Sequence, residues 1–429
     1  MDFEDFIDRI FNAITYLKFW KKNFSSLNKD IVNTALNITL LTLAVLICAS
    51  EAIGIIGTNN LTSFGVCTCQ FLYHFSGLCK WVIMILKLDD VKNILIRIKR
   101  CHEICLSYIE TQKEFFEYNQ KIQKLQSNVI MFAKLWFLLC ICGTFEWCLN
   151  PLIYDCYNIY ILKIPTTNYT RSLPYEAFFP WKIDTNKKYI MTFAFQLISA
   201  IATSAGMVIS DALNVIFLAN ISFNLEFLNI TLVKENKNFA ILRFSDSDMA
   251  IKKFKSKLRT CLIHHREILE YVFLFFQIKI VIYVIWPQSR DFLTTTMLRY
   301  ELKVRGGNPT IECVVQLISI VEFWFAVTVD LFLFSFLATR IEERVNGLTT
   351  ADAIYACNWE QSMINYDGDF TGDHRQTILD INQMISFSLM RAQKPITFQG
   401  GLFYVLSLET FKALTGFSLS NAVVLRQLS

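Results

Sequence analysis

Seven stretches of this chain are apolar over about 20 consecutive residues, the length that an α-helix needs to cross the hydrocarbon core of a membrane. An open sheet would leave backbone groups unpaired in lipid, so these stretches are predicted to be helices. We therefore expect an all-α membrane protein with seven transmembrane helices. The predicted spans are Ile31–Ile56, Leu61–Leu86, Asn128–Leu149, Tyr189–Leu218, Tyr271–Trp286, Thr310–Leu337 and Gly401–Leu428.

The fifth, sixth and seventh spans differ in character. The fifth is interrupted by the polar sequence from Trp286 to Arg290, whereas the sixth is clear. The seventh is moderately polar, which indicates that it faces water. An amphipathic helix is predicted before it, with an apolar face of Ile378, Ile381, Ile385 and Leu389. We expect a split seventh helix, broken near Pro395 and Gly400-Gly401.

Composition excludes several classes of protein. The chain has 429 residues, of which 53% are hydrophobic and only 18% charged, whereas a soluble domain is usually about one-quarter charged. The net charge of +4 is read as an orientation signal, because Lys and Arg accumulate on the cytoplasmic side of membrane proteins. Membrane lipid is thus the expected surrounding, and nucleic acid is not an expected partner.

No enzyme signature is present. The sequence has no GxSxG, no Gly-rich phosphate loop and no HExxH, so we expect no catalytic residue and no cofactor. Cys67 and Cys69 lack a second cysteine pair, which argues against a metal site. Cys148, Cys156 and Cys313 lie near predicted outer loops, and a disulfide among them stays open. The N-terminus lacks the features of a cleavable signal peptide.

Loop charges predict the orientation of the bundle. The N-terminal tail and the loops 87–127, 232–266 and 338–400 carry 5, 8, 9 and 5 Lys and Arg. The loops 57–60, 150–188 and 287–309 and the C-terminal end carry 0, 5, 4 and 1. The N-terminus is therefore predicted to be cytoplasmic and the C-terminus extracellular. Asn60 and Asn168 begin sequons in predicted outer loops and are candidate glycosylation sites.

Three ordered motifs resemble the insect odorant receptors. The most specific is C-terminal: LMRAQKP at 389–395, GG at 400–401 and LSLETF at 406–411. The second is an outer loop with LPY at 173–175 and PW at 180–181, followed by Tyr189 and Gln196. The third is ADAIY at 351–355, followed by Trp359. The layout of hydrophobic segments agrees over the whole chain, and the detailed motifs cover about a third of it.

The resemblance implies a ligand-gated cation channel of four subunits around one pore, in the plasma membrane of a sensory neuron dendrite. Residues 1–337 would form a six-helix bundle with a ligand pocket in its outer half. Residues 338–400 would form an intracellular loop and anchor helix, in which Tyr355 and Trp359 lie at a subunit interface. Residues 401–429 would form the pore-lining helix. The loop between spans four and five is short, so the chain resembles an odorant-binding tuning subunit that assembles with the longer co-receptor subunit as a heterotetramer.

The expected pore face follows from helical spacing. Phe417, Asn421, Val424 and Leu428 fall on one side of a helix. The resemblance implies that Val424 forms a hydrophobic gate, with Leu428 one turn further out, and such constrictions gate by dewetting. Gln427 would add a polar wall. The alternative is an apolar stripe that faces lipid or the bundle.

A small, volatile, apolar ligand needs an apolar cavity lined by aromatic side chains with few polar anchors. The outer halves of spans two to six supply candidates, of which His74 and Gln316 stand out because polar groups in a membrane bundle tend to be functional. The alternative for each aromatic residue is ordinary packing. The candidate ligand-binding residues are Tyr73, His74, Phe75, Thr144, Phe145, Trp147, Phe195, Ser199, Tyr283, Gln316 and Ile320.

Ionisable residues within the predicted spans admit two interpretations. One is a proton or ion relay of a secondary transporter. The other, which we favour, is that they are interhelical pairs, snorkelling ends or the lining of a water-filled outer vestibule. The residues are Lys80, Lys134, Glu146, Asp211, Lys279, Glu322 and Asp330. The pair His264-His265, at the cytoplasmic end of a span, is expected to be solvated.

Three other functions remain as alternatives. A gustatory-receptor-like channel usually carries Thr-Tyr, five residues and Gln-Phe in its last span, but here the positions read Ser420-Asn421 and Gln427-Leu428. Only the Gln agrees, which favours an odorant receptor. A secondary transporter would show internal repeat symmetry, and the sequence has none. A receptor coupled to G proteins would have an extracellular N-terminus.

We expect an epitope tag at the N-terminus to be stained only after cells are permeabilised, and a tag at the C-terminus to be stained on intact cells. The reason is that the loops rich in Lys and Arg stay cytoplasmic. Immunofluorescence of both tagged forms checks this. Staining of the N-terminal tag on intact cells would contradict the predicted orientation.

Overall fold

The computed structural model describes residues 3, 5–8, 10, 27–58, 61–163, 171–242, 247–279, 311–346, 349–355, 372–392 and 405–427. The elements in these ranges are helices, which confirms the predicted all-α fold. They are α2 (Leu27–Ile56), α3 (Leu61–Leu86), α4 (Leu88–Ser107), α5 (Gln112–Cys156), η2 (Tyr157–Ile161), α6 (Asn186–Leu242), α7 (Ser247–Lys279), α9 (Ile311–Asn346), α10 (Thr349–Tyr355), α11 (Gly372–Ala392) and α12 (Leu408–Gln427).

Five of the described helices are long and apolar enough to cross a membrane. They contain Thr34–Ile56, Phe64–Leu86, Gln112–Ile161, Asn186–Lys234 and Leu317–Glu343. These segments coincide with the first four predicted spans and the sixth. The fifth predicted span is described only as far as Lys279, at the end of α7. Within the seventh, α12 is a helix of 20 residues, while Gly401 and Leu428 lie outside the described residues.

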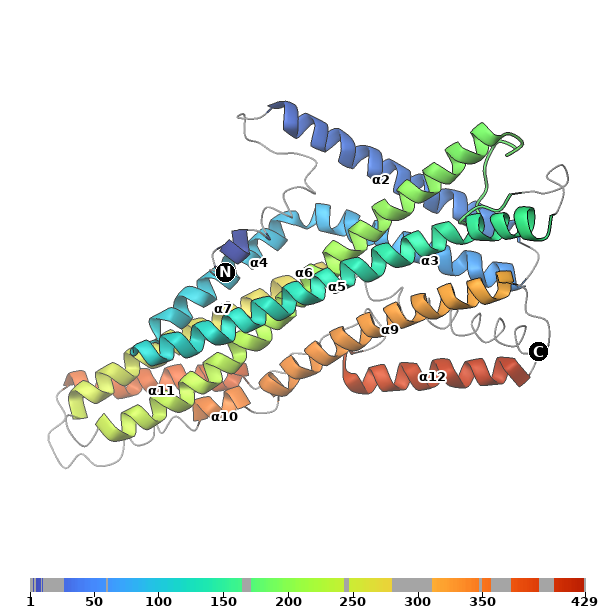
Figure 1. Cartoon of the computed structure of the whole chain (residues 1–429). Helices are drawn as coiled ribbons and strands as arrows, with labels where there is room; N and C mark the ends of the chain where they lie inside the picture. Colours follow the sequence, from blue (N-terminus) through green and yellow to red (C-terminus); the bar gives the residue numbers. More distant parts are fainter. Residues whose placement is uncertain are drawn as a thin grey trace.

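Two helices are much longer than the apolar spans that predicted them. α5 has 45 residues and α6 has 57, so α6 is about 85 Å long at 1.5 Å per residue, against a hydrocarbon core of about 30 Å. Figure 1 shows α6 running through the molecule, with α2, α3 and α9 around one part and α4, α7, α10 and α11 gathered at the other end. Hydropathy therefore predicted only the membrane part of each helix.

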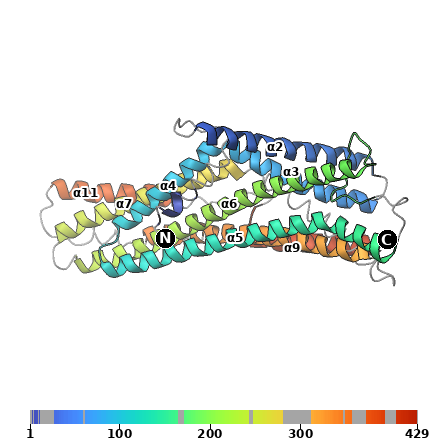
Figure 2. The same cartoon turned by 45° about the horizontal axis from the view of Figure 1, so that its top comes forward.

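Among the described residues, the largest hydrophobic core lies where α4, α7, α10 and α11 pack with α6 and the last turns of α9. Figure 2 shows α4, α7 and α11 together at this end of the molecule. Ile94 and Ile98 of α4 and Tyr271 of α7 are fully buried there. Ile381 and Ile385 of α11 join the same core, which confirms the predicted apolar face of this amphipathic helix. This end of the molecule is thus held by ordinary apolar packing.

The expectation that His264 and His265 are solvated is wrong. Both side chains are buried, and His264 Nε2 lies 3.3 Å from Asn224 Oδ1 of α6. Burial lowers the pKa of His264 to about 3 and that of His265 to about 4. Both imidazoles are therefore neutral at pH 7. Hydropathy did not indicate this because α7 is polar on its other face.

In the membrane part, α3 and α6 are joined by an ion pair. Lys80 Nζ lies 2.6 Å from Asp211 Oδ1, and both side chains are only 1% exposed. The two helices approach closely because glycines face the contact: a Cβ at Gly77 would overlap the backbone of Thr203, and one at Gly206 would press on Trp81. These two intramembrane charges are an interhelical pair, as we favoured.

We expect Asp211→Leu to lower the free energy of unfolding by about 3–5 kcal/mol, because it removes the carboxylate from a buried ammonium group. The double variant Lys80→Met/Asp211→Leu should recover most of this loss. The midpoint temperature of unfolding in detergent measures both. If Asp211→Leu alone is as stable as the parent, the ion pair does not contribute to stability as proposed.

Candidate ligand-binding site

A cavity lies among α3, α5, α6 and α9, below the segment that precedes α6. The empty space between its lining atoms is about 670 Å³, counting the part that is open to the surface. Its described lining is Cys69, Gln70, Tyr73, Trp136, Leu139, Cys140, Gly143, Thr144, Glu146, Trp147, Tyr175, Met207, Ser319, Glu322 and Ala326. Most of these side chains are apolar or aromatic, as a site for a small organic molecule requires.

Helical spacing brings the lining together. On α5, Trp136, Cys140, Gly143 and Trp147 recur every three or four residues and therefore share one face. The same spacing relates the lining residues of α9. Long helices packed on α6 thus place short, regularly spaced sets of side chains around one space, with no need for an irregular loop except at the outer end.

Three hydroxyl groups form a chain at the cavity. Tyr73 Oη lies 2.8 Å from Ser204 Oγ, and Ser204 Oγ lies 2.8 Å from Thr144 Oγ1. Thr144 also lies 2.7 Å from the Cys140 carbonyl within α5. The chain joins α3, α5 and α6 across the cavity wall, so these polar groups have partners in a part of the protein that excludes water.

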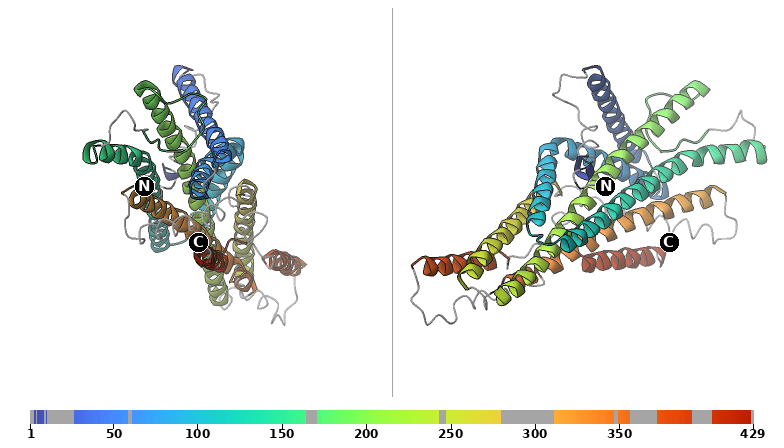
Figure 3. Two further views of the ribbon diagram at one scale, coloured as in Figure 1. Left: turned by 90° about the vertical axis from the view of Figure 1, so that its right-hand side faces the viewer. Right: turned by 60° about the vertical axis from the view of Figure 1, so that its left-hand side comes forward.

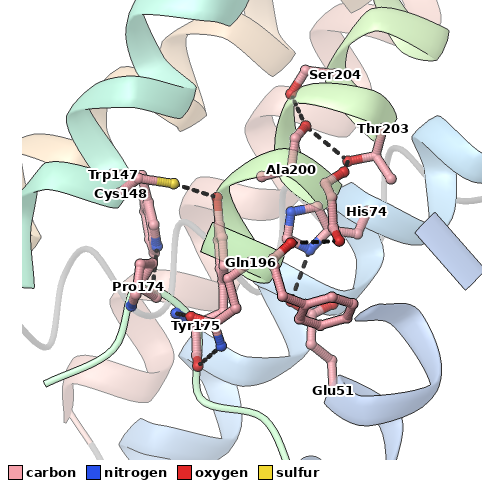
Figure 4. Close-up of polar contacts among 12 residues, drawn as sticks. Glu51, His74, Trp147, Cys148, Pro174, Tyr175, Gln196, Ala200, Thr203 and Ser204 are labelled. Atoms are coloured by element: carbon pink, nitrogen blue, oxygen red, sulfur yellow. Dashed lines mark hydrogen bonds and ion pairs between the residues drawn. The ribbon is translucent and has the colours of Figure 1, made fainter. Parts of the chain in front are cut away.

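The segment before α6 borders the cavity through Tyr175, and Figure 4 shows the polar contacts around this residue. Gln196 Nε2 donates to the Tyr175 carbonyl at 2.8 Å, and Gln196 Oε1 accepts from the Tyr175 amide at 3.3 Å. Trp147 Nε1 donates to the Pro174 carbonyl at 3.1 Å. The Cys148 thiol lies 3.6 Å from the Tyr175 hydroxyl. Residues of the outer-loop motif therefore make the contacts that hold this segment beside the cavity.

A hydrogen bond between two buried side chains lies beside this segment. His74 Nδ1 of α3 lies 2.7 Å from Glu51 Oε1 of α2, and neither side chain is exposed. The Tyr175 ring packs edge-on against the His74 ring, with 4.6 Å between centroids. His74 is thus next to a lining residue but is not part of the described lining.

The structure brings three of the predicted ligand-binding residues to the cavity: Tyr73, Thr144 and Trp147. Phe75 and Phe145 are instead exposed on their helices.

Two more predicted residues lie within the bundle, away from the described lining. Phe195 packs edge-on against Phe179, and Ser199 donates to the Phe195 carbonyl within α6. Tyr283 and the side chains of Gln316 and Ile320 lie outside the described residues. Ligand contact by any of these residues stays a prediction.

Sequence reasoning did not assign Trp136, Cys140, Tyr175, Glu146 or Glu322 to the cavity. A signal was present in the spacing, because Trp136 and Cys140 lie eight and four residues before the predicted Thr144, on the same helical face. The two glutamates were noticed only as intramembrane charges. Tyr175 belongs to a recognised motif, but its position over the cavity depends on the fold of the loop.

The remaining predicted sites are described only in part. Asn421, Val424 and Gln427 lie in the last turns of α12, and their side chains are outside the described residues, as is Leu428. Tyr355 ends α10 and is exposed.

Trp359, Asn60 and Asn168 also lie outside the described residues. Cys148 and Cys156 are free thiols, while the Cys313 side chain is not described. Among the described residues, no group of His, Cys, Asp and Glu is arranged to hold a metal ion.

Comparison with known proteins matches the sequence to a family and the structure to a known fold. The sequence matches the 7tm odorant receptor family over residues 60–283 and 309–419. The structure is similar to the insect olfactory receptor OR5 from Machilis hrabei, solved alone and in complex with eugenol. Each of these two matches has a TM-score of 0.72 and 15% identity, and covers 99% of this chain and 98% of the other. Curated protein sequences give no significant match.

We expect Gln196→Leu to loosen the segment over the cavity, because it removes both side-chain hydrogen bonds to the Tyr175 backbone. Hydrogen exchange of the Tyr175 amide should become about tenfold faster, since a hydrogen bond contributes about 1 kcal/mol net. Mass spectrometry of peptides that contain Tyr175 measures this. Gln120→Leu, at an exposed position of α5, is the control, and equal exchange in both variants would refute the role of Gln196.

Proposed function

Because this chain belongs to the 7tm odorant receptor family, we propose that it is the odorant-binding, tuning subunit of a heteromeric odorant-gated cation channel of olfactory neurons. It is a receptor and not an enzyme. In the proposed channel, the cavity among α3, α5, α6 and α9 binds the odorant, and α12 lines the pore. The partner is a co-receptor subunit, and the assembly lies in the plasma membrane of the dendrite.

The cavity is the observation that carries this proposal. It lies within the apolar bundle and is bordered by Tyr175 at the end that the charge distribution predicts to be extracellular. Its walls combine two tryptophans with the hydroxyl chain of Tyr73 and Thr144, the mixture of apolar surface and few polar anchors that a small organic ligand requires. A protein of the same fold has been solved with eugenol, which supports a ligand-binding function.

A single helix connects the cavity to the proposed pore. α9 contributes Ser319, Glu322 and Ala326 to the cavity lining. Further along, its Thr339 Oγ1 accepts from the Leu408 amide of α12 at 2.8 Å, and Phe332 packs against Phe411 of α12. Figures 1 and 3 show the two helices side by side. A ligand that binds more tightly to the arrangement with an open pore would shift the population toward it.

The tuning role is supported by the short connection between α6 and α7, which occupies only residues 243–246. The co-receptors that the chain resembles carry a large insertion between these spans. The exposed Tyr355 at the end of α10 supports a subunit interface at this position. Within the pore, we propose Val424 as the gate, Leu428 as the outer ring, and Asn421 and Gln427 as polar wall residues.

The test is co-expression with a co-receptor subunit in cells that lack both, followed by an odorant panel and measurement of cation current. We expect ligand-evoked current from the pair. In Ala326→Phe the half-maximal ligand concentration should rise about tenfold or more, because a ring added at the cavity wall overpacks the site by about 1–3 kcal/mol.

Ala35→Phe, at an exposed position of α2, should respond like the parent. If the pair reaches the cell surface and no odorant of any class evokes current, the channel function is refuted. Saturable flux without fast channel events would instead favour a transporter.

A further inference from the structure

Two carboxylates line one wall of the cavity, and they face no cation within its described lining. Glu146 of α5 and Glu322 of α9 are both lining residues and lie close enough to act on each other electrostatically. The other described lining residues include no Lys, Arg or His. A cavity lined mainly by apolar groups is an unfavourable place for two like charges.

The two glutamates differ in how they are held. Glu146 Oε1 lies 3.0 Å from Asn150 Nδ2 and 2.8 Å from Ser319 Oγ, which fixes its carboxylate between α5 and α9. The Glu322 carboxylate lies against Gly143 of α5, where a Cβ would be 3.1 Å from Glu322 Oε1. The absence of a side chain at Gly143 therefore gives the Glu322 carboxylate its place beside the cavity.

The basic group that acts on the cavity lining, Lys80, is already in an ion pair. The charged groups that act on Cys140, another lining residue, are Asp211, Asp330, Lys80 and Glu322. Lys80 is the single cation in this set, and its ammonium lies 2.6 Å from Asp211. Among the described groups that act on Cys140, three are therefore acidic and one is basic.

A third polar group also needs a hydrogen-bond donor. Gln70 of α3 is 6% exposed and lines the cavity, and its Oε1 has no hydrogen-bond partner among the described residues. A buried carbonyl without a donor is costly. Gln70 Oε1 thus adds an acceptor to the two carboxylates, on a different helix.

The aromatic lining suits a cation as well. Trp136 and Trp147 of α5 and Tyr73 and Tyr175 all border the cavity. The faces of such rings attract ammonium groups, tryptophan most strongly. Acidic and aromatic groups around one space therefore match both parts of an organic ammonium ion, its charged nitrogen and its apolar body.

We propose that the cavity binds a small organic amine in its protonated form, with the ammonium group near Glu322 and Glu146 and the apolar body against the tryptophans. This deepens the proposed function, because it names the chemical class of the odorant, and it rests on that function for its biological meaning. A neutral alcohol is the relevant competitor, since Trp136 Nε1 also lacks a partner among the described residues and would donate to a hydroxyl oxygen.

The test compares 2-phenylethylamine and hexylamine with 2-phenylethanol and hexanol, which have the same shapes without the charge. Binding to the purified full-length chain in detergent is followed by quenching of tryptophan fluorescence. At pH 7 we expect each amine to bind at least about tenfold more tightly than its alcohol, because hydrogen bonds to charged groups are about twice as strong as neutral ones.

The variant Glu322→Gln keeps the shape of the side chain and removes its charge. It should weaken amine binding about tenfold and change alcohol binding less than about twofold. The control is Glu343→Gln, an exposed position further along α9, which should change neither. Amines that bind no better than the alcohols, or a Glu322→Gln variant that weakens both classes equally, would overturn the proposal.

Current recordings separate this proposal from the channel function. Selective amine binding without current from the chain and its co-receptor would keep the ligand class and refute the channel. Current evoked by the alcohols, with amines that neither bind nor activate, would keep the channel and refute the ligand class. Failure of every compound to bind would refute the amine proposal directly.

Discussion

A polar group inside a bilayer has no water with which to form hydrogen bonds, and the rest of this structure depends on that constraint. Helices satisfy the backbone, and buried side chains pair with one another: Lys80 with Asp211, and His74 with Glu51. These pairs join α2, α3 and α6. Polar side chains that lipid would disfavour therefore hold together the part of the bundle that contains the cavity, while the larger apolar core lies at the opposite end.

The sequence predicted the helices better than it predicted the site. Hydropathy located the membrane part of α6, but not its continuation to Leu242, because that part is stabilised by contacts with α7 and α10 rather than by lipid. Helical periodicity correctly identified Ile381 and Ile385 as buried. His264 was misjudged because the burial of a polar residue depends on which helix packs against it.

Only some of the residues that were predicted to bind ligand, from their aromatic or polar character, line the cavity. Thr144 and Trp147 line it, whereas Phe145, between them in number, faces outward. Span membership cannot make this distinction, but the 100° step of the helix can. The lining role of Tyr175 was beyond such reasoning, because its backbone is held by two hydrogen bonds with Gln196, which is 21 residues away.

If the cavity binds the odorant, as proposed, the two roles of α9 would link the sensory range of the protein to its background activity. The same helix borders the cavity at Glu322 and supports α12 at Thr339. If α12 lines the pore, as proposed, a change on α9 that suits a new odorant also alters how often the channel opens in clean air. Diversification of odour preference would then accumulate on α3 and α5, whose cavity faces can vary without altering the direct contact between α9 and α12.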